Sequence, residues 1–142
     1  MSAAAHTPGP WRWELNERSK GLHLVGGVQM YDLTIMDFER WGMHSATVRL
    51  RDTTHDGMNI MHKLHERRDW IAPFAGRKHH FDWCADVTHP DARLIAAAPE
   101  LLQALQVTVE NWSSQFERQG HAAPKWAKQA RAAIAKATGA QP

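Results

Sequence analysis

The spacing of apolar positions changes once along the chain, near residue 88. Before this point apolar residues alternate with polar ones or stand in short runs, whereas after it they recur every three or four positions. Near the start, Trp11, Trp13 and Leu15 alternate with Arg12 and Glu14. A period of two predicts a strand with both tryptophans on one face.

More strands are expected in the remainder of the first half. Residues 22–25 and 28–31 are short apolar runs on either side of Gly26 and Gly27, which predicts a tight hairpin. Further strands are expected around residues 33–35 and 47–50. Residues 58–69 show only a partial helical stripe, and residues 76–86 have the composition of a loop or an irregular strand.

The second half has helical periodicity. Thr88 lies three residues before Asp91, as at the start of a helix with a capping box. Pro99 is expected to kink this helix or divide it in two, Gly120 to end it, and Pro124 to start another. The apolar stripe, which we expect to be the main buried surface, consists of Leu94, Ala98, Leu101, Leu105, Val109, Trp112 and Phe116.

Together these patterns predict an α+β fold. A small antiparallel sheet of three to five strands from the N-terminal half is expected to pack against two or three C-terminal helices. A length of 142 residues fits one ordinary domain. We therefore expect residues 1–142 to form a single domain, β-rich over 1–87 and helical over 88–139.

Charge and cysteine content restrict the classes of function. The net charge of +2 permits contact with phosphates but does not require it. Cys84 is the one cysteine, so the chain is no disulfide scaffold and suits a reducing compartment. No apolar run approaches the roughly 20 residues that span a bilayer, and the first ten residues lack a signal-peptide pattern. We expect a cytoplasmic protein without a membrane partner.

Two segments carry a resemblance to a known group. HTPGPW at residues 6–11 and DARLIAAAPELL at residues 91–102, with AAIAKA at residues 132–137, resemble a widespread group of uncharacterised phage and prophage proteins. The resemblance implies a phage genome as the source. It brings no activity, cofactor or catalytic residue with it, and it implies that the features specific to this chain lie in the variable middle, between about residues 16 and 88.

A binding function is favoured over catalysis because no catalytic motif stands out. The first hypothesis is a phage accessory protein that binds a host factor in the cytoplasm and inhibits a bacterial defence system. The alternative is binding of nucleic acid or a nucleotide by basic and aromatic residues of the middle, although neighbouring acidic residues dilute their charge. The candidate contact residues are Trp41, Arg49, Arg51, Arg67, Arg68 and Trp70.

A metal-dependent hydrolase or nuclease is the third hypothesis. On a helix, His62 and His65 would lie three residues apart and could share an ion that activates water. No recognised zinc-site spacing is present, so this hypothesis ranks below the two binding hypotheses. Cys84 is expected to pack as a small apolar residue rather than to act as a nucleophile. The further ligand candidates are His55, His79, His80, Asp82 and His89.

Overall fold

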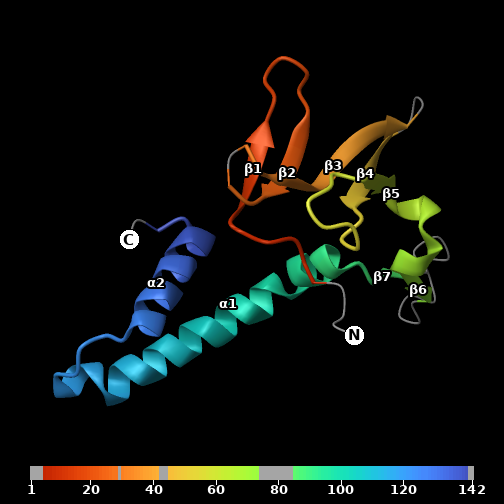
Figure 1. Cartoon of the computed structure of the whole chain (residues 1–142). Coiled ribbons are helices and arrows are strands. Elements are labelled where there is room, and N and C mark those ends of the chain that lie inside the picture. The colour runs from red at the N-terminus through yellow and green to blue at the C-terminus, as the bar shows by residue number, and fades with distance from the viewer. Residues whose placement is uncertain (1–4, 29, 42–44, 74–84, 141–142) are drawn as a thin grey trace. The chain divides into compact units, whose positions relative to one another are not determined.

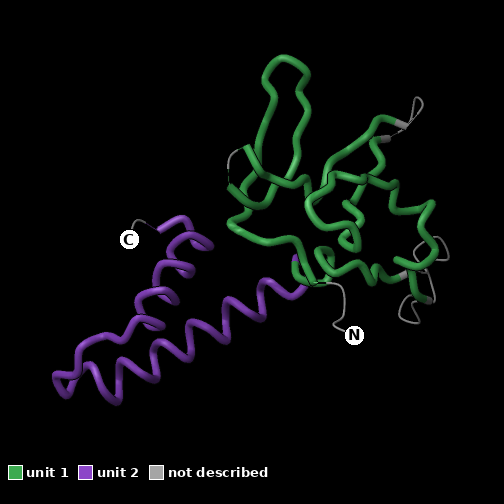
Figure 2. The backbone as a smooth tube through the Cα atoms, in the orientation of Figure 1, with its two compact units in different colours: residues 1–94 green, residues 95–142 purple. Residues whose placement is uncertain are grey.

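The computed structural model describes residues 5–28, 30–41, 45–73 and 85–140, and divides the chain into two compact units. Residues 1–94 form the first unit and residues 95–142 the second (Figure 2). Each unit is described by itself below. The expectation of one shared domain stays a prediction.

The first unit is built on a five-stranded antiparallel sheet in which each strand pairs with its neighbours in sequence (Figure 1). This confirms the predicted α+β class with an antiparallel sheet in the N-terminal half. The strands are β1 (Trp11–Leu15), β2 (Leu22–Gly26), β3 (Leu33–Trp41), β4 (Ser45–Arg51) and β5 (Met61–Lys63).

The hairpin predicted at residues 22–31 is wrong in detail. Gly26 is the last residue of β2, and the next strand begins only at Leu33. A Cβ on Gly26 would lie 2.5 Å from the Pro8 carbonyl oxygen, so glycine is required here for a close backbone approach. Gly27, with φ of 98°, provides the left-handed turn conformation that was expected of both glycines.

The stretch from 61 to 87 contains short elements and no α-helix in its described part. β5 leads into two 3₁₀ turns, η1 (Leu64–Glu66) and η2 (Arg68–Trp70). A second, two-stranded antiparallel sheet then pairs β6 (Ile71–Pro73) with β7 (Ala85–Val87). Most of the loop expected at residues 76–86 lies outside the described residues, as does Cys84.

The core of the first unit lies on the sheet. Leu24, Val25, Ile35 and Leu50 are buried, and Trp70 from η2 joins them. The register shifts by one residue between Leu24 and Val25, which marks a β-bulge in the pairing with β3.

Two helices follow, as expected. α1 (Pro90–Gln115) contains Pro99 without being divided by it, and α2 (Lys125–Thr138) begins directly after Pro124. Between them, η3 (Glu117–Gln119) ends at Gly120, whose φ of 89° is the left-handed conformation of a helix terminus.

The expectation that the stripe on α1 is the main buried surface is wrong. Val109 is buried, but Leu101 is 53% and Phe116 44% exposed. The facing helix presents mainly small residues, and Ala127 and Ala130 are its buried ones. A partner helix of alanines covers only part of a stripe of large side chains.

Candidate functional site

Thr7 and Asp91 join the two segments that carry the phage resemblance. The Thr7 amide donates a hydrogen bond of 2.6 Å to Asp91 Oδ1, and the Thr7 hydroxyl donates one of 2.7 Å to Asp91 Oδ2. Both residues are fully buried. The start of the chain is thereby tied to the first turn of α1, which gives these segments a role in the scaffold.

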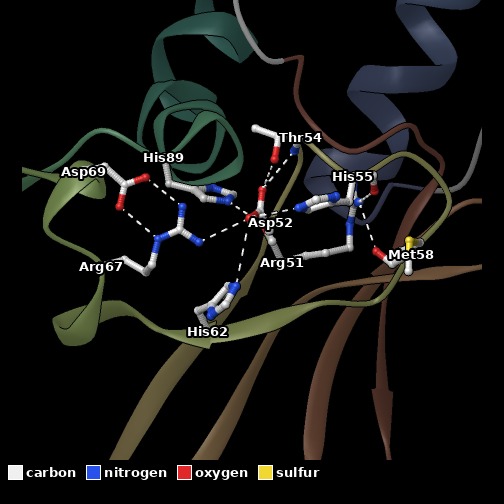
Figure 3. A network of polar contacts seen from close by, with 9 residues as sticks. All are labelled: Arg51, Asp52, Thr54, His55, Met58, His62, Arg67, Asp69 and His89. Carbon is white, nitrogen blue, oxygen red and sulfur yellow. Dashed lines mark hydrogen bonds and ion pairs between the residues drawn. The ribbon is translucent and has the colours of Figure 1, made fainter.

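Arg51 completes this buried cluster. It is 3% exposed, and its Nη2 donates to the Thr7 hydroxyl at 2.8 Å. Thr7 therefore stands between the guanidinium and the Asp91 carboxylate. Nη1 reaches the carbonyl oxygens of His55 and Met58 at 3.4 Å each (Figure 3), while Nε has no hydrogen-bond partner within the described part of the chain. Loss of Thr7 would leave two buried charges poorly compensated.

Both ring nitrogens of His89 hydrogen-bond to the backbone. Its Nε2–H donates to the Arg51 carbonyl oxygen at 2.7 Å, and its Nδ1 accepts the Asp91 amide at 3.1 Å. The ring is 1% exposed and meets the Trp70 ring edge-on at 4.6 Å. Because both nitrogens are used in this way, His89 has no lone pair to offer a metal.

Asp52 is the centre of a second polar network (Figure 3). Its Oδ1 accepts bonds from the amide and hydroxyl of Thr54 at 3.0 and 2.6 Å, and its Oδ2 accepts Arg67 Nη1 at 3.2 Å. Burial raises the pKa of Asp52, but the hydrogen bonds from Thr54 and Arg67 outweigh it and lower the pKa to about 2.

Arg67 is fixed on three sides. Its Nε and Nη2 donate to the two carboxylate oxygens of Asp69 at 2.8 and 2.7 Å, and its guanidinium lies 4.1 Å from the Trp70 ring centre. Hydrogen bonds to Asp69 and Asp52 raise the pKa of Arg67 above its ordinary value. The charge of Arg67 is therefore compensated by the carboxylates of Asp69 and Asp52.

The histidines predicted to share a metal have different surroundings. His62 lies on β5, with its Nε2 3.9 Å from Asp52 Oδ2, whereas His65 lies in η1 beside the Thr47 hydroxyl at 3.3 Å. The helix expected to carry both is absent from this described stretch. No group of three histidine, cysteine or acidic side chains among the described residues is arranged to hold an ion. The candidates His79, His80 and Asp82 lie outside them.

A pocket of about 620 Å³ lies beside the Asp52 network. Arg67, its best-placed cation, directs its donors to Asp52 and Asp69. The charge of Arg67 is therefore compensated within the pocket wall, whereas Arg93, which also lines the pocket, is exposed. Its lining residues are Ala5, His6, Asp52, Thr53, Thr54, Arg67, Asp69, Trp70, Thr88, Pro90 and Arg93.

The six predicted contact residues do not gather on one exposed surface. Arg51 and Trp70 are 3% and 7% exposed, which leaves a partner little to touch. Arg49 makes a bidentate pair with Asp37, at 2.8 and 2.6 Å. Arg67 is engaged as described, Arg68 is exposed in η2, and the side chain of Trp41, which ends β3, is outside the described part. A role in binding for Trp41, Arg49 and Arg68 stays a prediction.

One face of the sheet carries a polar row across its strands. The register places Glu14 opposite His23, His23 opposite Asp37, Asp37 opposite Arg49, and Arg49 opposite Lys63. Glu14 lies 3.1 Å from His23, and this hydrogen bond is the largest cause of the lowered pKa of Glu14. The hydrogen bonds of Glu14 with His23 and of Arg49 with Asp37 cross neighbouring strands and compensate much of the charge of this face.

The other face carries a row of large apolar side chains. Trp13 pairs with Leu24 and Leu15 pairs with Leu22, and the same register places Leu22 beside Phe38 on β3. We call Trp13, Leu15, Leu22 and Phe38 the apolar row. Their exposed fractions are 55%, 63%, 40% and 48%. A period of two shows that Trp13 and Leu15 share a face, but not that these two side chains are left exposed by the described part of the chain.

The same face is covered at its other end. Leu50, 2% exposed, pairs with His62, and the His62 ring lies 6.0 Å from the Trp70 ring. Trp70 in turn packs on His89, just before α1. The uncovered part of this face therefore belongs to β1, β2 and β3.

The fold and these surfaces define the class of protein. It is an α+β chain with a polar scaffold network and an uncovered apolar row, and none of the described helices is long and apolar enough to cross a membrane. The family model described as "Salmonella phage P22 protein Y8K6" matches residues 1–141, and the chain belongs to this phage protein family. Neither a curated protein nor a solved structure matches it.

Proposed function

We propose that this phage protein binds a protein of its bacterial host in the cytoplasm, and that it thereby inhibits a host defence system. The apolar row carries the proposal. Exposed apolar surface that contains a tryptophan is typical of protein–protein contact sites, where a few large side chains supply most of the binding free energy. Trp13, at 55% exposure, is the expected anchor.

The charges around the apolar row indicate the chemistry of the partner surface. The loop at residues 16–21 adjoins Leu15 and Leu22, and it exposes Arg18 and Lys20 against one acid, Glu17. Arg40, also exposed, follows Phe38 by two residues on β3 and shares its face. An apolar centre with a basic rim favours a partner with an apolar patch and an acidic rim.

The nucleic-acid alternative draws less support from the geometry. Phosphate binding needs cations whose charge is available to the ligand. Arg49 and Arg67 instead form bidentate pairs with Asp37 and Asp69. No binding of single-stranded DNA, together with host-protein binding that weakens only modestly as salt screens the basic rim, is the outcome expected for a contact centred on the apolar row.

Site-specific crosslinking tests the proposal. A photoreactive residue at position 15 is expected to crosslink one host protein in bacterial extract, whereas the same residue at position 31 is not. Tyr31 is the matched control because it is 81% exposed but lies in the turn beyond Gly26, at the opposite end of β2 from Leu22. Crosslinks from position 31 alone, or from position 15 to a second copy of this chain alone, would contradict the proposal.

The captured protein, once purified, allows a quantitative test. Leu15→Asp is expected to weaken its binding by about tenfold or more, and Tyr31→Asp to leave it within about twofold, because only the first places a charge in the buried centre. Equal affinities of the two variants would contradict a role for the apolar row. A captured protein without any part in defence would overturn the inhibition claim and leave the binding claim standing.

A further inference from the structure

The helical unit has a very small core of its own. Val109 on α1 and Ala127 and Ala130 on α2 are its buried apolar residues. Trp112 and Trp126 meet edge-on at 5.9 Å, and Arg131 ties the helices by bonding Glu117 at 2.6 Å and Ser113 at 2.8 Å. Two helices joined by a few contacts bury too little apolar surface to be stable by themselves.

Large apolar side chains of this unit remain exposed. Leu101 is 53% and Val107 49% exposed on α1, and Trp126 is 44% exposed on α2. Phe116, between the helices, is 44% exposed. Helices with apolar surface outside their mutual contact need a further layer of secondary structure against them.

The charges of the two helices are opposite in sign. From residue 95 to 115, α1 carries Glu100 and Glu110 and no lysine or arginine, which gives −2. α2 carries Lys125, Lys128, Arg131 and Lys136 and no acid, which gives +4. Of the two-fold arrangements of two such hairpins, the one that brings the acidic α1 of each copy against the basic α2 of the other pairs opposite charges.

We propose that a second copy of this chain covers the apolar face of the helical unit, so that two helical hairpins form a four-helix bundle. A bundle of this kind buries the facing apolar stripes of all four helices in one core. The charge pattern selects the pairing of α1 with α2 between copies and disfavours α1 with α1 or α2 with α2. The proposed dimer surface and the apolar row consist of different residues, because the apolar row belongs to residues 1–94.

Sedimentation equilibrium of the full chain tests the dimer. The chain has a mass of 16.1 kDa, so the expected species has twice this mass, or 32.2 kDa, and dissociates on dilution. Leu101→Asp is expected to raise the dissociation constant by about tenfold or more, whereas Leu15→Asp in the first unit leaves it unchanged. A wild-type chain that stays at 16.1 kDa at all concentrations overturns the proposal.

A pair of charge-reversed variants tests the pairing between copies. One carries Glu100→Lys and Glu110→Lys, the other Lys125→Glu and Lys128→Glu; all four positions are exposed, so the fold tolerates the changes. The first variant alone is expected to be monomeric, because its α1 becomes +2 and faces an α2 of +4 across the two-fold axis. In the second variant α2 falls from +4 to 0, so the attraction to α1 is lost and the dimer is expected to be weakened. An equimolar mixture is expected to restore the dimer. Mixing leaves the charges within each hairpin as they were and changes only those that face each other between copies. Failure of the mixture to dimerise therefore contradicts the pairing between copies.

Discussion

The two ends of one sheet face differ in what covers them. At the β4–β5 end, Leu50 is buried under a layer in which Trp70 and His89 are tied to the backbone and to α1. At the β1–β3 end, the apolar row has no such layer and its side chains are 40–63% exposed. The covered end has the properties of a scaffold, and the uncovered end has those of a contact surface. Departures from the rule that apolar faces are covered are expected at functional sites.

The covered end depends on residues that are far apart in the sequence. Thr7, Arg51 and Asp91 meet in one buried cluster, and Asp52 and Arg67 form the next one. At the uncovered end, the apolar row is brought together by the pairing of neighbouring strands alone. If this contrast is correct, substitutions at the covered end lower stability and substitutions in the apolar row do not.

The largest effect is expected from Thr7→Val. Valine removes the hydroxyl between Arg51 and Asp91 at nearly constant volume, and it leaves two buried charges with fewer partners. We expect a loss of about 3 kcal/mol in the free energy of unfolding, measured by urea denaturation. Thr53→Val, at a half-buried position on the pocket wall, is the control and is expected to cost under about 0.5 kcal/mol. Similar losses of unfolding free energy for both variants would argue against a special contribution of the cluster of Thr7, Arg51 and Asp91 to stability.

A smaller effect is expected from the titration of Asp52. Its pKa falls from the ordinary 3.8 to about 2 in the folded protein, so the charged form is stabilised by folding. The contribution is present above pH 4 and is lost as the pH falls from about 4 to 2, and it amounts to about 2 kcal/mol. Asp52→Asn is expected to remove this part of the pH dependence. Parallel stability profiles of the wild type and the Asp52→Asn variant, measured from about pH 5 to 2, would contradict the role of Asp52.

The smallest effect on stability is expected in the apolar row. Leu15→Asp replaces a side chain that is 63% exposed, so we expect a change within about 0.5 kcal/mol of wild type by the same urea measurement. A loss above about 2 kcal/mol would show that the row is covered in solution, and the contrast between the two ends would then fail.

Local patterns predicted the elements but not the polar networks. Alternation predicted the strand at Trp11. The spacing of Leu105 and Val109 predicted the first helix, with its end at Gly120, and Pro124 predicted the start of the second. The pairing of Thr7 with Asp91 joins residues 84 positions apart, and no local rule reports it. Arg51 was expected at a contact surface because it belongs to a loose group of basic residues interleaved with aromatic ones, yet it is buried beside Thr7.

The candidate contact surface was missed for a different reason. Alternation shows which residues share a face of a sheet, but the cover of that face comes from other parts of the chain. The alternation at Trp13 and Leu15 therefore does not tell whether their face is covered. The histidine hypothesis depended on a helix at residues 58–69, and His62 and His65 are instead separated by the end of β5.

Methyl resonances of the leucines test the central claim most directly. With the purified host partner added to the full chain, the methyl groups of Leu15 and Leu22 are expected to shift or broaden. Those of Leu24 and Leu50, which are buried at 5% and 2% exposure, are expected to stay in place. Shifts confined to the helical unit, at Leu101 and Leu105, with Leu15 and Leu22 unchanged, would contradict the assignment of the apolar row as the binding surface.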